Sequence, residues 1–478
     1  MESSTILSYF DTICTIPRES GKEDRIVEYL KSFAKSNQLN YKEDEVGNVV
    51  IVREASIGLE KAPTVILQSH SDMVCEKNSN SSHNFDTDPI KYIIKDGWMI
   101  APETTLGADC GIGMAAQLAI LADKESSYPR IEALFTVEEE TGLKGAKSLK
   151  PGFISGNLLI NLDSEDEGEI FIGCAGGIDT TARFKFGTFS SKITNQKTVK
   201  VHFFGATGGH SGDDINKNRA NAVQILSRFL YLLDKSVHFE IHNIDGGNKR
   251  NAIAREALAV ISIDYINYPT LLEILKQVTA EVKTEHKISD PEFNSKIEEL
   301  PNETNSIDTN VVRRLIYALN SAPHGVLEMS QEIPDFVETS TNLASVKTLS
   351  DTIVVATSQR SSINSARYNA ANRLESIFKL AGAEVSHESE YPGWRPNTNS
   401  KLLEQGKKSY KKIFNREPVV RAIHAGLECG MFLDIYPDLD MISFGPTIRG
   451  VHAPGERLDL ESLDKFTIFL DELLKSIN

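Results

Sequence analysis

Runs of apolar residues that end in acidic or imidazole side chains recur in the first third of the chain. Three of them, "APTVILQSH", "IEALFTVEEE" and "NLLINLDSE", are rich in branched aliphatic residues and predict buried β-strands. "MAAQLAILADK", a run of small and apolar residues, predicts a helix, and its glycine-rich entry "LGADCGIG" permits close approach of the backbone to a ligand. This alternation of strands and helices predicts an α/β sheet with helices on its faces.

The pattern changes after about residue 180. The strands expected from "TVKVHFFGATGGHSG", "AREALAVISIDYI" and "AEVSHESE" are separated by helices expected from "ANAVQILSRFLYLLDK", "TLLEILKQVTAEV" and "NSARYNAANRLESIFKLAG". From "YPGW" onward the α/β texture resumes, with the helix "NSKLLEQGKKSYKKIF" and the strand "DLDMISFG". We therefore expect an α/β domain formed by residues 1–180 and 391–478, interrupted by an inserted α+β domain at 181–390.

Length and charge agree with this division and narrow the class of partner. A chain of 478 residues exceeds the size of one ordinary core, so two domains are expected. The formal net charge is -16, from 67 acidic and 51 basic side chains. Nucleic acids and anionic membranes require clustered Lys and Arg, so small molecules, peptides or metal cations are the expected partners.

The chain also carries indications of its cellular compartment. The start "MESSTILSYFDTICTIPRES" has no basic segment followed by an apolar one, and no later apolar run is long enough to span a bilayer. The five cysteines, at positions 14, 75, 110, 174 and 429, are odd in number, scattered and without a CxxC pair. Reduced thiols in a cytoplasmic protein are the expectation.

Potential metal ligands follow the predicted strands of the α/β domain. In an open α/β sheet, bound molecules and ions lie beyond the carboxyl ends of the strands. Five side chains directly follow apolar runs and fall at such ends: His70, Asp72, Glu139, Glu140 and Asp163. Asp109 in the glycine-rich loop and His452 in "GVHAPGERL" could enter the same crevice.

These residues form a mixed nitrogen and oxygen donor set suited to zinc or another divalent transition metal. The carboxylates outnumber the needs of one tetrahedral ion, so two ions sharing a carboxylate are an option, as in sites where paired metals activate water. Each residue alone also has a purely structural interpretation, as a helix cap, a turn residue or a solvated charge. The convergence of several such residues at strand ends favours the metal site.

The ordered motifs resemble those of a known family. "LQSHSDMV", "TTLGADCGIGMA", "ALFTVEEETGLKGA", "NLDSEDEGEIFIGCAGG", "GATGGHSGDDI", "GGNKRNAIAREA", "AIHAGLECG" and "SFGPTIRGVHAPGERL" are similar to successive motifs of the aminoacyl-histidine (Xaa-His) dipeptidases. These enzymes belong to the co-catalytic zinc peptidases, a group that includes carboxypeptidase G and peptidase T. The resemblance covers nearly the whole chain, from "IPRESGKE" to the C-terminal segment.

The resemblance assigns roles in the α/β domain, which becomes the catalytic domain with a central mixed sheet between helices. It implies that His70, Asp109 and Asp163 bind one zinc ion. The second zinc would be bound by Asp109, Glu140 and His452, so that Asp109 bridges the pair. Glu139 matches the general base of the family, and Asp72 matches the residue that orients His70.

The inserted domain matches the lid domain of the family, which in relatives often mediates dimerisation. His210 in "GGHSG" matches a histidine that polarises the scissile carbonyl, and Arg360 in "SQRSS" matches an arginine that holds the C-terminal carboxylate of the substrate. The motif "AIHAGLECG" resembles a substrate-side loop, which makes His424 and Glu428 candidates. For these two residues, a hydrogen bond that only fixes the loop is the alternative interpretation.

The chain departs from the family pattern at three places. Cys110 replaces the asparagine common in relatives, and its thiol could ligate, oxidise or pack, with packing favoured because the implied ligand set is complete without it. "HAPGE" lacks the hydroxyl and carboxylate of the usual "HSPDE" string, and Ala254 stands where proline is frequent. No implied ligand is lost, so an active enzyme is expected.

The resemblance implies a dipeptidase that uses two zinc ions, with manganese or cobalt as substitutes, and cleaves Xaa-His and other unblocked dipeptides. A homodimer through the lid domain is a further expectation. Two alternatives stay open: an amidohydrolase acting on N-acyl amino acids or a tripeptide, and a paralogue that binds metal or peptide without turnover.

Overall fold

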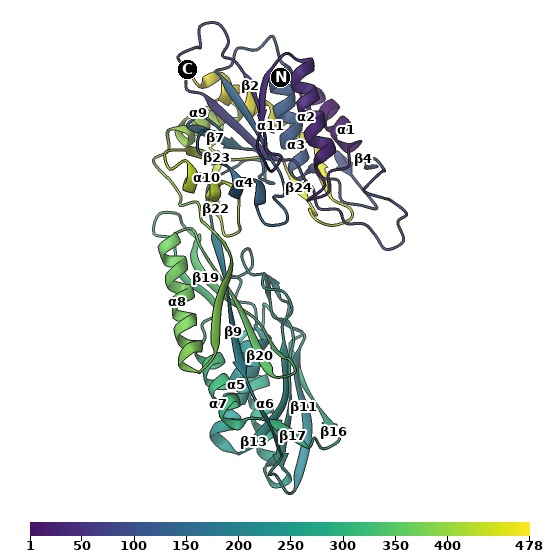
Figure 1. Ribbon diagram of the computed structural model, residues 1–478, viewed down its shortest axis with the longest axis vertical. Helices are drawn as coiled ribbons and strands as arrows, with labels where there is room; N and C mark the ends of the chain where they lie inside the picture. Colours follow the sequence, from purple (N-terminus) through teal and green to yellow (C-terminus); the bar gives the residue numbers. More distant parts are fainter. The chain divides into compact units, whose positions relative to one another are not determined.

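The computed structural model describes residues 1–478 as two compact units (Figure 1). Unit 1 comprises Met1–Gly173, Trp394–Ala422 and Leu427–Asn478, and unit 2 comprises Cys174–Gly393 and Ile423–Gly426. The boundaries expected at 180 and 390 are therefore displaced by a few residues, because a long strand of unit 2 already begins at Gly176. Residues 423–426, expected in the catalytic domain, pack with unit 2 instead.

Unit 1 is built on an eight-stranded mixed sheet in the order β1-β2-β6-β3-β7-β23-β8-β22. β3 runs parallel to both β6 and β7, and β7 runs parallel to β23, whereas β1, β2 and β6 are antiparallel neighbours. The strands are β1 (Asn40–Glu43), β2 (Val49–Arg53), β3 (Val65–His70), β6 (Ile131–Thr136), β7 (Leu158–Asn161), β8 (Glu169–Cys174), β22 (Val419–Ile423) and β23 (Asp440–Ser443). Every residue of β3 and β6 is buried, as expected for strands covered on both faces.

Helices cover this sheet, and a small second sheet adjoins it. α3 packs on β3, and α9 packs on β23. The helices are α1 (Ser3–Cys14), α2 (Asp24–Ser36), α3 (Ala108–Ala122), α4 (Lys144–Ser148), α9 (Lys401–Phe414), α10 (Cys429–Ile435) and α11 (Leu460–Ser476). The small sheet has the order β24-β25-β5-β4, from β4 (Ile93–Lys95), β5 (Trp98–Ile100), β24 (Ile448–Arg449) and β25 (Arg457–Asp459).

Unit 2 contains a nine-stranded sheet with the order β16-β11-β15-β13-β19-β20-β9-β21, and β18 pairs with β19. Its strands are β9 (Gly176–Lys185), β11 (Gln196–Phe204), β13 (Phe239–Gly246), β15 (Ala257–Asp264), β16 (Asn294–Leu300), β18 (Gly325–Met329), β19 (Val337–Thr348), β20 (Thr352–Ser361) and β21 (Glu384–Tyr391). All neighbours are antiparallel. Two short pairs join β10 (Thr188–Ser190) to β17 (Asn305–Ile307) and β12 (Gly209–His210) to β14 (Ala252–Ile253).

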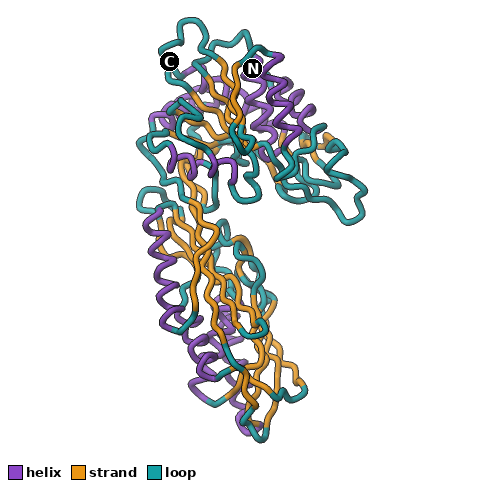
Figure 2. The backbone as a smooth tube through the Cα atoms, in the orientation of Figure 1, coloured by secondary structure: helices purple, strands orange, loops and turns teal.

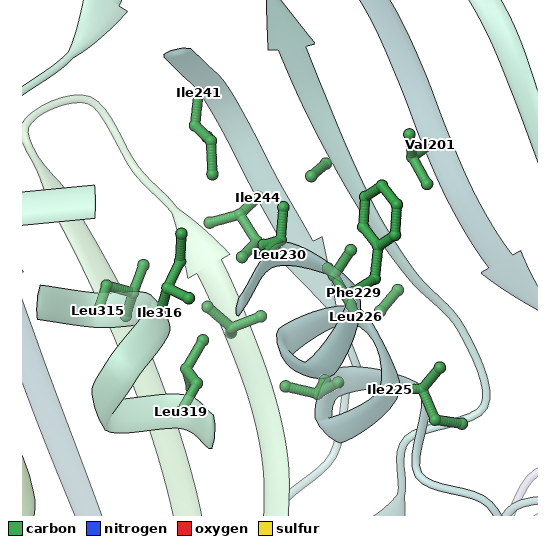
Figure 3. Packing of buried hydrophobic residues seen from close by; sticks show 14 of the residues in the cluster. Val201, Ile225, Leu226, Phe229, Leu230, Ile241, Ile244, Leu315, Ile316 and Leu319 are labelled. Atoms are coloured by element: carbon green, nitrogen blue, oxygen red, sulfur yellow. The ribbon is translucent and has the colours of Figure 1, made fainter. Parts of the chain in front are cut away.

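The helices of unit 2 lie along one side of its sheet (Figure 2). They are α5 (Ala222–Ser236), α6 (Tyr268–Glu285), α7 (Thr309–Ser321) and α8 (Asn364–Leu380), with a short 3₁₀ turn η1 (Tyr265–Asn267) before α6. Figure 3 shows α5 residues Leu226, Phe229 and Leu230 packed with Ile244 of β13 and Ile316 of α7. The Asn221 side chain caps α5 by accepting from the backbone N–H groups of its first turn. Each unit thus has its own apolar core.

Two findings bear on the environment of the chain. None of its helices combines the length and the apolar character needed to cross a bilayer. None of the five cysteines forms a disulfide, and four of them are buried.

Candidate metal centre

The carboxyl ends of three parallel strands place the candidate ligands of unit 1 together. His70 is the last residue of β3, Glu139 and Glu140 follow β6, and Asp163 follows β7. Because β6, β3 and β7 are adjacent and parallel, their carboxyl ends meet at one edge of the sheet. Asp109 comes from the first turn of α3, whose N-cap Gly107 has a positive φ of 68°.

The side chains form a continuous cluster centred on Asp109. His70 Nε2 lies 3.1 Å from Asp109 Oδ1 and 3.3 Å from Asp163 Oδ1. On the other side, His452 Nε2 lies 3.2 Å from Asp109 Oδ2 and 2.9 Å from Glu140 Oε1. Asp109 therefore touches one histidine with each carboxylate oxygen.

The electrostatics of this cluster favour a bound cation. Burial would lower the pKa of His70, but the Asp163 and Asp109 carboxylates raise it well above its usual value. Hydrogen bonds with Asp109 and Glu140 raise the pKa of His452 to about 11. Burial raises the pKa of Asp163 to about 6, and its buried Oδ1 makes no hydrogen bond. The carboxylates thus favour the protonated, positively charged form of both histidines. Bound divalent ions can supply this positive charge in place of the protons.

The donor set fits a metal site on chemical grounds. Imidazole nitrogens and carboxylate oxygens are the ligands that zinc and similar divalent transition metals accept. The ligand atoms of His70, Asp109 and Glu140 all lie within 4.8 Å of one another, as do those of His70, Cys110 and Asp163. The sequence-predicted ligands His70, Asp109, Glu140, Asp163 and His452 are therefore brought together by the fold.

Asp72 contacts both the first histidine and the glutamate turn. Its Oδ1 lies 3.3 Å from His70 Nδ1 and accepts from the N–H of Glu139 at 3.0 Å. Its Oδ2 accepts from the Ser20 hydroxyl at 2.7 Å and from the N–H of Glu140 at 3.2 Å. Burial opposes ionisation, yet the hydrogen bond with His70 lowers the pKa of Asp72 to about 2. A carboxylate behind a ligating histidine fixes the orientation of its ring.

The three consecutive glutamates have different environments. Burial raises the pKa of Glu139 well above its usual value, with His70 opposing the shift and the Asp163 carboxylate adding to it. Glu140 contacts His452, as described above. Glu138 forms an ion pair with Lys144, and its backbone N–H donates to Glu23 at 2.9 Å. Glu139 and Glu140 thus interact with members of the cluster, whereas Glu138 pairs with Lys144.

Two residues that the sequence analysis did not select as candidates form hydrogen bonds to the loops of the candidate metal centre. Glu456 accepts backbone hydrogen bonds from Leu106, Gly107 and Ala108 at 2.7–2.9 Å and from Asp109 at 3.4 Å. The buried Arg18 donates to the carbonyls of Ser71, Asp72 and Gly107. Both residues lie inside quoted motifs, "HAPGE" and "IPRESGKE". Their hydrogen bonds to distant loops are seen only in the folded structure.

Two further acidic side chains adjoin the centre. The fully buried Glu428 accepts from Gln68 at 2.6 Å and from Thr136 at 2.7 Å, and burial raises its pKa to about 8. Glu165 also has a pKa raised to about 8, first by burial and then by Asp109 and Asp163. The two hydrogen bonds of Glu428 join this side chain to β3 and β6.

Cys110 follows Asp109 and is buried. Its Sγ donates to the carbonyl of Leu162 at 3.3 Å. Burial raises the pKa of the Cys110 thiol well above its usual value, and the Asp163 carboxylate adds to this shift. Its burial and its hydrogen bond to Leu162 agree with a packing role. Ala254, another departure from the family pattern, is buried in the core of unit 2.

The remaining candidates lie in unit 2. His210 Nδ1 is 3.2 Å from Asp213 Oδ2, and the backbone N–H of His210 donates to Asp214 Oδ2 at 2.8 Å. Arg360 on β20 is 8% exposed, donates to the Tyr391 hydroxyl at 3.0 Å and leaves its buried Nε without a hydrogen bond.

His424 lies beside the nine-stranded sheet of unit 2. Its Nε2 is 2.7 Å from the Ser340 hydroxyl. Burial lowers the pKa of His424 to about 3, and the Arg360 charge adds to the shift. His424 is therefore neutral at physiological pH.

Comparisons with known proteins agree in pointing to one family. The model described as "Peptidase family M20/M25/M40" matches residues 66–476. The chain is 37% identical over 468 residues to the Escherichia coli protein named cytosol non-specific dipeptidase, covering 98% of this chain and 96% of that one. It is likewise similar to the crystal structure of aminoacylhistidine dipeptidase from Vibrio alginolyticus, with a TM-score of 0.92, 38% identity and coverage of 100% and 98% of the two chains.

A more distant solved structure, a tripeptidase from Staphylococcus aureus, shares the fold with a TM-score of 0.58 at 17% identity, covering 100% of this chain and 99% of that one. The family resemblance found in the motifs and the predicted mixed α/β fold are both confirmed.

Proposed function

The chain belongs to peptidase family M20/M25/M40, and from this premise we propose that it is a metal-dependent dipeptidase. The observation that carries the proposal is the placement of Asp109 between His70 and His452, with Glu140 and Asp163 beside them. The printed names of the Escherichia coli and Vibrio alginolyticus relatives support dipeptides as substrates. One relative is named non-specific and the other for aminoacyl-histidine, so we propose a broad range that includes Xaa-His.

We propose that two divalent ions bind here. His70, Asp109 and Asp163 would hold one ion, and Asp109, Glu140 and His452 would hold the other. Zinc is the expected metal, with manganese or cobalt as substitutes, because imidazole and carboxylate ligands suit all three. When bound, the ions supply positive charge that polarises the scissile carbonyl and lowers the pKa of water.

The chain's own residues would then move the proton. Glu139 lies on the turn that Asp72 holds through two backbone hydrogen bonds. We propose that its carboxylate takes a proton from the attacking water and returns it to the amine of the leaving amino acid. Burial raises the pKa of Glu139 well above its usual value, and this shift favours uptake of a proton from water.

Substrate recognition is assigned to unit 2. Arg360 would bind the C-terminal carboxylate, since a buried guanidinium with an unpaired Nε can form a charge-assisted hydrogen bond. His210 would donate to the developing oxyanion, and Asp213 lies beside its ring. His424 would contribute to binding as a neutral ring. Glu428 would support the centre from behind through Gln68 and Thr136.

Cellular context and assembly are further expectations. The word "cytosol" in the name of the Escherichia coli relative supports a cytoplasmic location.

We propose a homodimer formed through unit 2, where β16 ends the order of the nine-stranded sheet and offers an unpaired edge. Light scattering on the purified protein would give twice the mass of one chain, and a mass of one chain at micromolar concentration would contradict the dimer.

A substrate panel tests the proposed activity. Metal-free protein is reconstituted separately with zinc, manganese and cobalt, and it is assayed with dipeptides, tripeptides and N-acyl amino acids. We expect hydrolysis of dipeptides, including Xaa-His, that depends on added metal. Preferred turnover of N-acyl amino acids or tripeptides would identify the alternative hydrolase, and absence of turnover with bound metal would identify a non-catalytic paralogue.

A further inference from the structure

Arg360 belongs to a row of paired residues that crosses four strands of unit 2. In the register of the sheet, Tyr391 of β21 faces Gly177 of β9, and Gly177 in turn faces Arg360 of β20. Arg360 also faces Ser340 of β19 on its other side. Residues directly opposite one another on neighbouring strands present their side chains on the same face of the sheet. The row Tyr391, Gly177, Arg360 and Ser340 therefore shares one face.

Gly177 leaves the space that the tyrosine ring occupies. A Cβ atom at Gly177 would lie 2.5 Å from Cε1 and 2.8 Å from the hydroxyl oxygen of Tyr391. Gly426 also borders this ring, since a Cβ there would lie 3.0 Å from Cε2 of Tyr391. The ring thus lies across a glycine in the row, next to a second glycine, and its hydroxyl accepts from Arg360 Nη1 at 3.0 Å.

The backbone of Tyr391 is also held in place. Arg367 of α8 is 1% exposed, donates to the Tyr391 carbonyl and pairs with Glu390 at 2.8 Å. The Gly393 N–H donates to Asn364 at 3.0 Å, which attaches the same segment to the start of α8. These contacts restrict the movement of Tyr391. Its hydroxyl therefore offers Arg360 a hydrogen-bond acceptor in a fixed position.

We infer that Tyr391 is a positioning residue for Arg360 and thereby sets the preference of the enzyme for substrates with a free C-terminal carboxylate. This inference rests on the proposed role of Arg360. The hydroxyl of Tyr391 restrains one end of the guanidinium, while the buried Nε remains without a hydrogen bond. A restrained guanidinium loses less conformational freedom when it binds a carboxylate, so the benefit falls on substrate binding.

The test compares Tyr391→Phe with a matched control, Tyr368→Phe, in the full-length metal-loaded protein. Tyr368 on α8 also loses only a phenol hydroxyl, and its partner Glu390 precedes Tyr391. Kinetics are measured with alanyl-leucine, and inhibition is measured with leucine and with leucinamide, which lacks the carboxylate. For Tyr391→Phe we expect KM to rise about 5- to 20-fold and kcat to change less than about twofold, as for loss of one hydrogen bond to a charged group.

The inhibitor pair separates the possible results. In the wild type and in Tyr368→Phe, leucine should inhibit better than leucinamide, so the ratio of the inhibition constant of leucinamide to that of leucine should exceed one. Tyr391→Phe should lower this ratio about as much as it raises KM. If Arg360→Met abolishes the ratio while Tyr391→Phe keeps it at the wild-type value, the inference is overturned and the role of Arg360 stands. If the wild type itself shows no ratio, the assignment of Arg360 fails, and the inference fails with it. A lower melting temperature with unchanged KM and ratio would give Tyr391 a purely structural role.

Discussion

Adjacent residues of the same type carry different chemistry in this protein. Glu138, Glu139 and Glu140 follow one strand, yet only Glu138 pairs with a surface lysine. Glu140 contacts His452, and Glu139 has a strongly raised pKa. In the same turn, Asp72 accepts hydrogen bonds from two successive backbone N–H groups, those of Glu139 and Glu140. The three side chains therefore have different surroundings, although they are neighbours in the sequence.

Replacement of Glu139 tests the proton-transfer role directly. Glu139→Gln keeps the size of the side chain but removes its ability to accept a proton, so kcat on a dipeptide should fall about 10²- to 10⁴-fold. Bound metal, measured by elemental analysis, should stay near the wild-type amount because Glu139 is outside the proposed ligand set. Wild-type turnover in the purified variant would rule out Glu139 as the base.

His424 should make the stability of the protein depend on pH. Its pKa lies near 3 in the folded chain and near 6.5 when unfolded, so between these values the unfolded chain binds one more proton. Stability from this group is therefore present above pH 6.5 and decreases as the pH falls toward 3. The decrease amounts to at most about 1.4 kcal/mol per pH unit.

Urea unfolding at pH 7, 6 and 5 measures this dependence. The variant His424→Gln cannot titrate, so its free energy of unfolding should change less with pH than that of the wild type. Equal pH slopes for the two proteins would show that His424 is not buried in its neutral form.

At the scale of elements, the strand ends were predictable and the partners between loops were not. The apolar runs before His70, Glu139 and Asp163 have the composition of buried strands, and the structure places β3, β6 and β7 there. Glu456 contacts the N–H of Asp109, 347 positions earlier in the chain. No local pattern encodes such a contact, because it depends on where the small sheet holds the "HAPGE" loop.

The same limit applies to the row around Arg360. Its members come from four strands, and a shift of register by one residue would turn a side chain to the opposite face. The motif "SQRSS" identified the arginine, but only the pairing of β9 with β20 and β21 shows that Gly177 stands between it and Tyr391. Glycine in a strand indicates close approach without identifying the approaching group.

Glu456 should control the geometry of the loop that carries Asp109. In Glu456→Gln, an amide NH₂ replaces an oxygen that accepts backbone hydrogen bonds, so two N–H donors of the loop would face another donor. Metal affinity, measured by competition with a chelator, should fall about 10- to 100-fold, as for other residues that orient ligands. The control Glu461→Gln removes a carboxylate that is 80% exposed and should leave affinity unchanged. Equal affinity of Glu456→Gln and the wild type would contradict this role.

At the scale of the whole molecule, the proposed metal ligands are confined to one unit, whereas both units contain buried apolar residues. All five proposed ligands belong to unit 1, whereas unit 2 has its own core of strands and helices. The sequence predicted an insertion because its texture changes and later resumes. It could not show that residues 423–426 pack with unit 2, because that short return is defined only by contacts.

Metal removal should therefore affect the two units differently. A ligand that binds only the folded state stabilises it by about 2.7 kcal/mol at a free concentration 100 times its Kd, and the stabilisation is confined to elements that unfold with the site. Hydrogen exchange with and without zinc should show faster exchange of the metal-free protein in the segments 70–73, 106–111 and 137–141 of unit 1. The nine-stranded sheet of unit 2 should exchange at the same rate in both states. In Asp109→Ala, which lacks the residue proposed to be shared by two ions, added zinc should give no protection. Equal protection of both units by zinc would mean that their unfolding is coupled, and protection in Asp109→Ala would place the ions on other ligands.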